Sequence, residues 1–229
     1  MDFFRTCCFG FAIKGVFRAA LSKRRYWRGI IGDWDLLFFK KMDKNIEFRR
    51  QGFHLVLGII LVYLLYNGIL NLLGMFAVLV AGFVLSLASR KYKFIFVNWM
   101  LKNFDRKDEI LPGYGALTYF LGSIIVVGLF SKEIALASIM VLAFGDSFSH
   151  LGRFGKMKNP FSRTKFLEGT VLGIIAGTLG AGLFVSWEAA FFGSLIAMSV
   201  EGLELAIFKK KIDDNLLIPV IAGLIMSLF

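Results

Sequence analysis

Residues 145–170 combine acidic, basic and glycine residues in a pattern that suits a bound phosphate group. Asp146 stands before a loop with five Lys and Arg residues and two glycines, and Glu168 follows that loop. Carboxylates hold Mg²⁺, basic side chains neutralise phosphate oxygens, and glycine lets backbone N–H groups approach them. A helix expected at 167–185 would add the positive end of its dipole. We therefore expect this stretch to bind a polyphosphate with Mg²⁺.

Other features of this stretch have simpler explanations. Its basic residues also fit an ordinary cytoplasmic loop of a membrane protein, but Asp146 favours a functional site because an ionisable residue beside a bilayer is costly to place. His150 lies one helical turn after Asp146. A pair without a third ligand is weak evidence for a transition-metal site, so we expect a solvated interfacial histidine. The four-residue spacing of Gly169, Gly173 and Gly177 is interpreted as close helix packing.

Further candidates lie outside this stretch. Asp213 and Asp214 follow three lysines, and we expect Asp214 or Asn215 to cap the last helix, although two adjacent carboxylates exceed what one cap needs. Glu201 lies about two turns inside an apolar helix, where burial of a charge needs a reason. His54 follows a pair of arginines and could bind an anionic group, although an ordinary membrane flank explains it as well.

The composition excludes an ordinary soluble domain. Of 229 residues, 57% are hydrophobic and 19% are charged, and the mean hydropathy is +0.70. Soluble domains are about 45–50% apolar and about 25% charged. The formal charge of +11 must lie in short polar segments, which favours a membrane face or a phosphorylated substrate over nucleic acid. Cys7 and Cys8 are adjacent, so no disulfide is expected.

Long apolar runs predict an all-α fold, a polytopic membrane helix bundle with about seven transmembrane helices. The expected spans are 52–66, 69–89, 113–130, 133–151, 167–185, 188–208 and 215–229. Asn67 and Gly68 predict a tight turn between the first two. Residues 1–51 carry twelve Lys and Arg residues among aromatic ones, so we expect a basic interfacial segment there, followed by a membrane-embedded domain at 52–229.

The expected topology places nearly all positive charge on one side of the membrane. With the N-terminus in the cytoplasm, 26 of the 27 Lys and Arg residues fall in 1–51, 90–107, 152–166 and 209–211. Only Lys132 falls outside. This asymmetry indicates cytoplasmic basic loops and an external C-terminus. We expect a prokaryotic or archaeal plasma membrane rather than an endoplasmic reticulum.

Several motifs are distinctive when they occur together. In chain order they are His54 after a basic pair, Gly115-Ala116-Leu117, Gly145-Asp146, Gly152-Arg153-Phe154-Gly155-Lys156, Lys165-Phe166-Leu167-Glu168-Gly169-Thr170, and Asp213-Asp214-Asn215-Leu216 with Pro219. This combination resembles the polyprenol kinase family, which includes dolichol kinase, phytol kinase and the CTP-dependent diacylglycerol kinase and is related to the phosphatidate cytidylyltransferases. The resemblance covers about residues 49–229. The family often has two basic residues before the Phe-Gly where this chain has only Arg153, which leaves the acceptor lipid open.

The resemblance implies transfer of the γ-phosphoryl group of CTP to the hydroxyl of a membrane isoprenoid alcohol such as dolichol or polyprenol. It implies Asp146, Glu168 and Lys165 as catalytic residues, and Asp146, Asp213 and Asp214 as ligands of Mg²⁺ or another divalent cation. CTP would be bound by Gly145, Gly152, Arg153, Gly155, Lys156, Gly169, Thr170 and Asn215. The lipid would be bound by His54 and Glu201.

Four alternatives stay open. The chain could be a CTP-dependent diacylglycerol kinase, or a cytidylyltransferase that forms a CDP-lipid. A transporter would account for Glu201 and Glu204 inside an apolar helix, but the acidic residues gather at one membrane face without a polar path to the other. A non-enzymatic scaffold would not explain why acidic residues cluster in the basic loops.

Overall fold

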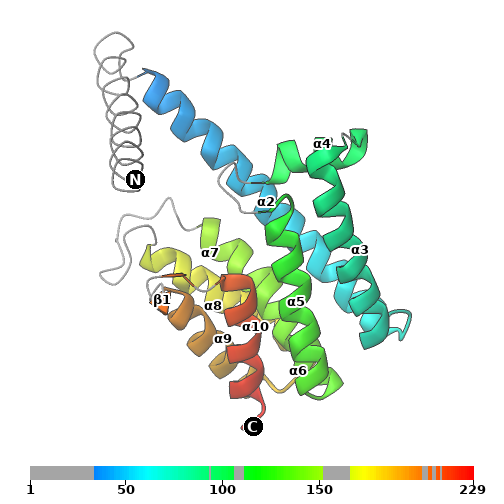
Figure 1. Cartoon of the computed structure of the whole chain (residues 1–229). Helices are drawn as coiled ribbons and strands as arrows, with labels where there is room; N and C mark the ends of the chain where they lie inside the picture. The colour runs from blue at the N-terminus through cyan, green and yellow to red at the C-terminus, as the bar shows by residue number, and fades with distance from the viewer. Residues whose placement is uncertain are drawn as a thin grey trace, which may run out of the picture. The chain divides into compact units, whose positions relative to one another are not determined.

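The computed structural model describes residues 34–92, 94–105, 111–151, 166–202, 206–207, 210–211 and 213–229. The chain divides into two compact units, Met1–Asn45 and Ile46–Phe229. The second unit holds most of the described residues, and its helices run back and forth between two ends (Figure 1).

Helices make up almost all of the described part, so the all-α expectation is confirmed. They are α2 (Trp34–Tyr66), α3 (Leu72–Lys91), α4 (Ile95–Phe104), α5 (Tyr114–Leu129), α6 (Lys132–Met140), the π-helix η1 (Val141–Asp146), α7 (Ser147–Leu151), α8 (Leu167–Ala181), α9 (Trp187–Gly202) and α10 (Asp214–Met226). Two short strands, β1 (Ala206–Ile207) and β2 (Lys210–Lys211), pair antiparallel.

Helix α2 runs without a break through the expected start of the first span. We expected that span to begin at residue 52, and this was wrong because residues 40–51 are mostly good helix formers without proline. Gly52 costs about 1 kcal/mol within a helix, too little to end one that continues into an apolar run. As a result Glu47 and Arg50 lie on the same helix as His54, two turns and one turn before it.

The turn between α2 and α3 falls where Asn67 and Gly68 predicted it. Gly68 has φ +69°, a left-handed conformation that favours glycine. The side chain of Asn71 then caps α3 by accepting a hydrogen bond from the backbone N–H of Gly74 at 2.8 Å. These residues join two antiparallel helices closely.

Helix α4 was not expected from the sequence, because its ten residues are too few to show as a span. It is tied to α2 at two points: Arg49 Nη1 donates to Asn103 Oδ1 at 3.0 Å, and the rings of Phe53 and Phe104 lie 5.2 Å apart. Its other side is open, and Ile95 is 91% exposed. A short helix with one packed and one exposed apolar side is typical of a membrane surface.

The expected helix at 133–151 contains a π-helical segment in its middle, η1. Val141, Leu142 and Ala143 in this segment are almost completely buried. Single π-helical turns inside α-helices occur frequently at functional sites. Here the segment ends at Asp146, the acidic residue singled out above.

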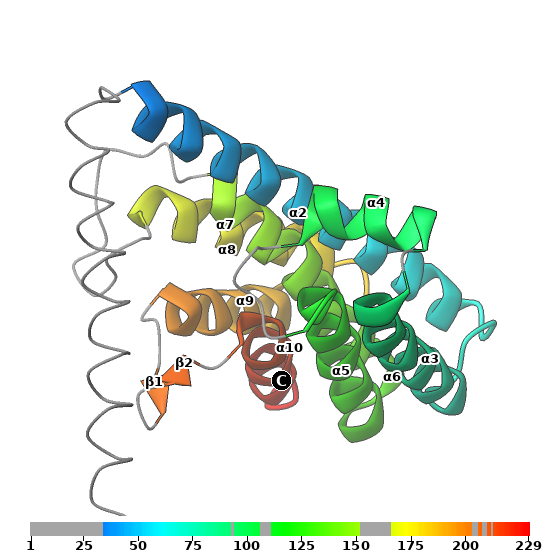
Figure 2. The ribbon, with the colours of Figure 1, turned by 45° about the horizontal axis from the view of Figure 1, so that its top comes forward.

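Glycines allow α8 to pack closely against η1 and α9. Figure 2 shows α8 and α9 as neighbouring helices of the unit. A Cβ on Gly145 would lie 2.7 Å from Sδ of Met198, and one on Gly173 would lie 2.8 Å from the carbonyl oxygen of Gly145. A Cβ on Gly177 would lie 3.1 Å from Oγ of Ser194. The interpretation of the glycine stripe as a packing surface is therefore confirmed.

The last helices differ from expectation at their ends. Helix α9 ends at Gly202 rather than at residue 208. Helix α10 is capped by Asp213, whose Oδ1 accepts a hydrogen bond from the backbone N–H of Asn215 at 3.0 Å. We expected Asp214 or Asn215 as the cap, but the extended backbone of Asp213 (φ −67°, ψ 125°) is the one that suits this position.

By length and composition, two helical stretches of the described part can cross a membrane: Glu47–Tyr66 and Leu72–Lys91. Three shorter helices are also apolar, namely Tyr114–Leu129, Leu167–Ala181 and Asp214–Met226. Apolar side chains are exposed on several helices, including Leu73 on α3 and Leu179 on α8. This exposure is compatible with a membrane protein. Seven spans stay a prediction.

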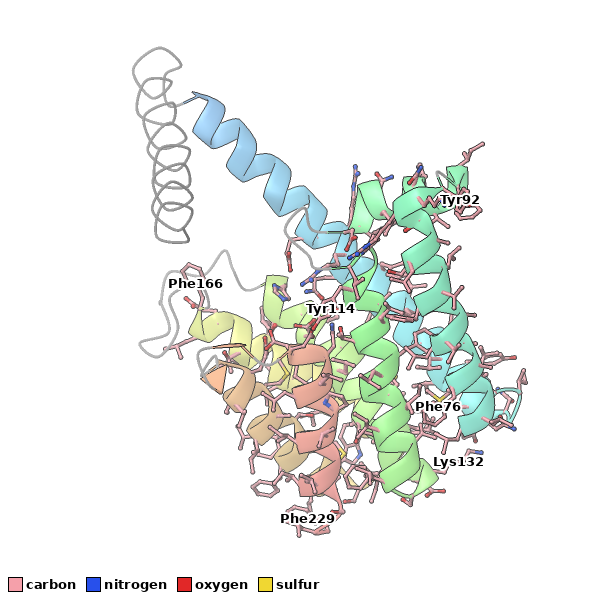
Figure 3. The ribbon with its side chains drawn as sticks, in the orientation of Figure 1. Phe76, Tyr92, Tyr114, Lys132, Phe166 and Phe229 are labelled. Atoms are coloured by element: carbon pink, nitrogen blue, oxygen red, sulfur yellow. The ribbon has the colours of Figure 1, made fainter. Side chains whose placement is uncertain are left out.

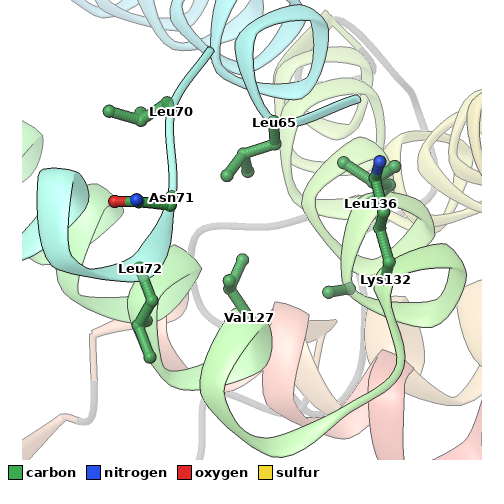
Figure 4. Close-up of a pocket in the computed structure, with 8 residues that line it drawn as sticks. Leu65, Leu70, Asn71, Leu72, Val127, Lys132 and Leu136 are labelled. Atoms are coloured by element: carbon green, nitrogen blue, oxygen red, sulfur yellow. The ribbon is translucent and has the colours of Figure 1, made fainter. Parts of the chain in front are cut away.

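An apolar pocket of about 280 Å³ lies near the turn between α2 and α3 and the start of α6 (Figure 4). It is lined by Leu65, Leu70, Asn71, Leu72, Val127, Lys132, Ala135 and Leu136. Lys132 Nζ donates to the carbonyl oxygen of Tyr66 at 2.9 Å and lies 5.5 Å from the centre of its ring. The ammonium group of Lys132 thus connects the start of α6 to the end of α2.

Candidate functional site

Polar side chains from several helices gather at the end of the unit where Figure 3 labels Tyr114, whereas Lys132 and Phe229 mark the opposite end. We call this set the polar cluster. It consists of Glu47, Arg50, Gln51 and His54 of α2, Thr118 and Tyr119 of α5, Asp146 and His150 of η1 and α7, and Asp213 and Asn215 at the start of α10. Five predicted site residues lie outside the described part of the chain: Gly152, Arg153, Gly155, Lys156 and Lys165.

Asp146 is buried, with 5% of its surface exposed. Its Oδ1 lies 3.3 Å from Nε2 of His150, and Nδ1 of the same ring lies 3.8 Å from Oε1 of Glu47 in α2. The side chain of His150 is 10% exposed, so the expectation of a solvated histidine was wrong. The reason is the length of α2, which extends far enough to place Glu47 against this ring.

Glu47 and its neighbours connect α2 to α7. Glu47 Oε1 accepts a hydrogen bond from Arg50 Nη2 at 2.8 Å, and Gln51 Nε2 lies 3.5 Å from the same oxygen. The hydroxyl of Ser147 donates to the backbone carbonyl of Gln51 at 3.0 Å. The residue after Asp146 is therefore fixed to the helix that carries Glu47.

His54 and Tyr119 form a buried aromatic pair between α2 and α5. Their rings stack with centroids 5.1 Å apart, and 3% and 0% of the two residues are exposed. His54 Nδ1 and the Tyr119 hydroxyl have no hydrogen-bond partner among the described residues. Gly115 lies beside this pair, where a Cβ would be in ordinary van der Waals contact with His54 Nε2 at 3.6 Å.

The first turn of α10 docks on the first turns of α5. The side-chain nitrogen Nδ2 of Asn215 donates to Oγ1 of Thr118 at 3.0 Å and to the backbone carbonyl oxygen of Gly115 at 3.3 Å. Burial raises the pKa of Asp213, while the N–H of Asn215 and the hydroxyl of Thr118 oppose that rise. The positive charge of Arg50 also opposes the rise in the pKa of Asp213.

The other described candidates are placed as follows. Glu168 and Thr170 are half-buried in the first turn of α8, with Gly169 buried between them. Gly145 packs closely against α8 and α9. This packing explains why a glycine stands at position 145 and does not require a bound nucleotide. Glu201 is 2% exposed at the end of α9. Asn215 serves the contact between α10 and α5 described above.

No group of three or more His, Cys, Asp or Glu residues that could hold a metal ion occurs in the part of the chain that the structure describes. Mg²⁺ at nucleotide sites is held by one or two carboxylates together with phosphate oxygens and water. Asp146, which is buried, and Asp213, which is half-buried, carry carboxyl groups of this kind. The chemistry of these two donors fits a Mg²⁺ ion that arrives with its nucleotide.

Comparisons with known proteins found relatives among lipid kinases. The protein of Saccharomyces cerevisiae named CTP-dependent diacylglycerol kinase 1 is 26% identical over 218 residues, covering 79% of this chain and 72% of its own. A protein of Triticum aestivum named probable phytol kinase, chloroplastic, is 28% identical over 140 residues, covering 54% of this chain and 46% of its own. Both names are those of lipid kinases, the class of enzyme that the motifs resembled. The chain is therefore similar to proteins named as lipid kinases.

An uncharacterized protein of Methanocaldococcus jannaschii is also similar to this chain, with 28% identity over 185 residues, covering 79% of this chain and 93% of its own. No protein-family model matches the chain, and no solved structure matches it.

Sequence reasoning missed several members of the polar cluster. Glu47 and Gln51 lie in a segment that we expected to be a separate membrane anchor, and Tyr119 lies within an apolar run. The spacing of Glu47, Arg50 and His54 at three and four residues was the available signal, because it places all three on one face of a helix.

Proposed function

We propose that the chain is a CTP-dependent lipid kinase that transfers the γ-phosphoryl group of CTP to the hydroxyl of a membrane isoprenoid alcohol such as dolichol or polyprenol. The observation that carries this proposal is the buried Asp146 carboxylate, which is linked through His150 to the charged residues of α2. Burial of such a group at one end of an apolar bundle is costly and needs a function. The names of the relatives and the shared motifs support the same activity.

In this proposal the nucleotide binds where the basic loop follows Asp146. Arg153, Lys156 and Lys165 neutralise the triphosphate, and the first turn of α8, with Gly169 and Thr170, faces it. Asp146, with Asp213 or Asp214, holds Mg²⁺. When bound, Mg²⁺ supplies positive charge to the β- and γ-phosphates.

The acceptor hydroxyl approaches from the bilayer toward His54. Unpaired buried polar atoms cost about 1–3 kcal/mol each, and a hydroxyl placed beside His54 Nδ1 and the Tyr119 hydroxyl would satisfy them. The acceptor oxygen attacks the γ-phosphorus, the bond from that phosphorus to the β–γ bridging oxygen breaks, and CDP leaves. The hydroxyl proton passes to Glu168. Glu201 contributes to binding of the lipid acceptor in this proposal.

The proposal includes a membrane arrangement. Seven spans, with residues 1–51 as an anchor on the cytoplasmic surface, place the basic loops in the cytoplasm and the C-terminus outside. The polar cluster then lies at the cytoplasmic face, where CTP is available. A prokaryotic or archaeal plasma membrane is the proposed location.

A second candidate is a CTP-dependent diacylglycerol kinase, favoured by the name of the yeast relative. It would use the same site with a different acceptor. A cytidylyltransferase that forms a CDP-lipid would use the same nucleotide and metal but would transfer the α-phosphorus with its nucleoside.

One experiment separates these activities. The purified chain in lipid vesicles receives CTP labelled at either the α- or the γ-phosphorus, with polyprenol, diacylglycerol or phosphatidate as acceptor. We expect label from the γ position on polyprenol. Label from γ on diacylglycerol alone would support the second candidate, and label from α on phosphatidate would refute a kinase. Ion flux in vesicles without nucleotide would revive a transporter.

A further inference from the structure

Glu47 contacts residues of α2 and α7, and none of the roles assigned above uses it. Its carboxylate belongs to α2, whereas Asp146 ends η1 and His150 lies in α7. We propose that Glu47 is a positioning residue, which holds Arg50 against the first turn of α5 and orients His150 beside Asp146. This inference rests on the proposed function.

One oxygen of Glu47 makes all of the contacts concerned. Oε1 accepts a hydrogen bond from Arg50 Nη2 at 2.8 Å, lies 3.5 Å from Gln51 Nε2 and lies 3.8 Å from His150 Nδ1. The side chain of Glu47 is 14% exposed, so water screens these contacts only in part. A single carboxylate shared by three nitrogen groups fixes their positions relative to one another.

On one side of Glu47, the guanidinium of Arg50 lies against α5. Arg50 Nη1 would lie 4.0 Å from a Cβ on Gly115, so it packs on the first turn of α5. Without the Glu47 carboxylate, the guanidinium would keep its charge but lose a charged hydrogen-bond acceptor at 2.8 Å.

On the other side of Glu47, His150 contacts Asp146. The two ring nitrogens of His150 face two carboxylates, Glu47 Oε1 at 3.8 Å and Asp146 Oδ1 at 3.3 Å. Neither contact is a hydrogen bond, so the two carboxylates act on the ring through their charge and bias its orientation beside Asp146. Partners of metal-binding residues typically change metal affinity or activity by about 10- to 100-fold when they are replaced.

Other contacts attach α2 to the rest of the unit, so the role of Glu47 can be separated from folding. The Ser147 hydroxyl bonds to the backbone of Gln51, Arg49 bonds to Asn103, and the ring of Phe53 packs on Phe104. None of these involves the Glu47 carboxylate. Glu47→Gln keeps the size of the side chain and removes its charge.

The test compares Glu47→Gln with wild type in vesicles, using γ-labelled CTP, polyprenol and a series of Mg²⁺ concentrations. We expect kcat to fall by about 10- to 100-fold, the Mg²⁺ concentration for half-maximal activity to rise by about tenfold, and the KM for the lipid to stay unchanged. The control is Glu188→Gln, an exposed acid in the first turn of α9, which should leave all three values unchanged.

A double-mutant cycle with His150→Gln checks the path. If Glu47 acts through His150, the double variant loses little more activity than the worse single variant. Full additivity, or a Glu47→Gln enzyme with wild-type kcat and Mg²⁺ requirement, overturns the proposal. Should Glu47→Gln fail to fold, His150→Gln decides, and an unchanged Mg²⁺ requirement in that variant overturns it. If the wild type transfers no phosphate, the proposed function fails first and the inference falls with it.

Discussion

The two ends of the helical unit treat polar groups in different ways. At the polar cluster, buried side chains contact partners from distant parts of the chain, as Ser147 does with Gln51 and Asn215 does with Thr118. At the opposite end, the Lys132 ammonium bonds to the carbonyl of Tyr66, beside a pocket that is mostly apolar. Burying polar groups is costly unless they are paired. The unit accepts this cost at the end where the proposed chemistry occurs.

The largest effect on activity is expected from neutralising Asp146 in the polar cluster. Asp146→Asn keeps the size of the buried side chain but removes a proposed metal ligand, so turnover should fall by about 10³-fold or more, while the protein stays folded. Phosphoryl transfer from γ-labelled CTP and the thermal unfolding temperature are measured together. An active Asp146→Asn enzyme would remove Asp146 from the site.

A smaller effect is expected from the basic loop. Lys156→Ala should lower kcat/KM for CTP by about 10- to 100-fold, since a charge-assisted contact is worth about 1.5–3 kcal/mol. The control is Lys91→Ala at the exposed end of α3, which should leave the kinetics for CTP unchanged. Equal effects of the two variants would mean that net charge, rather than a specific contact, binds the nucleotide.

The docking of α10 on α5 can be tested through a glycine. A Cβ on Gly122 would lie 2.2 Å from the carbonyl oxygen of Asn215, so Gly122→Ala must push the two helices apart. We expect a loss of stability of about 1–3 kcal/mol and reduced activity. Gly128→Ala is the control on the same helix, because the nearest atom would be 3.9 Å away on a flexible leucine. Chemical denaturation in detergent measures both, and equal stability of the two variants contradicts the close approach.

The smallest effect is expected at the opposite end. Lys132→Ala removes one exposed hydrogen bond and a contact with the ring of Tyr66, which should cost at most about 1 kcal/mol of stability. Its kcat should equal that of wild type. A marked loss of turnover would show that the two ends are coupled, and the contrast drawn above would no longer hold.

The sequence predicted the features that follow from long patterns. Apolar runs predicted the helices, Asn67 and Gly68 predicted their turn, and the spacing of Gly173 and Gly177 predicted packing. Asp146 was also found in advance as a candidate, because a charge beside a long apolar run stands out.

What the sequence did not predict depends on contacts between distant segments. The role of Glu47 could not be foreseen because it requires α2 to begin well before residue 52 and to meet His150, more than a hundred residues after Glu47. Local propensity did not distinguish Asp213 from Asp214 as the cap of α10, since both can accept the same bond. The π-helix was missed because its residues have the same apolar pattern as an ordinary helix.

The π-helix also affects how this segment tolerates a change in length. Each residue of an α-helix turns the next by about 100°, whereas the i→i+5 hydrogen bonds of a π-helix fit about one extra residue into a turn. Removing one residue between Met140 and Asp146 would therefore let the segment return to regular α-helix and leave the acid on nearly the same side of the bundle. The extra residue is absorbed within the buried apolar part of the segment, so the position of Asp146 does not depend on a regular α-helix before it.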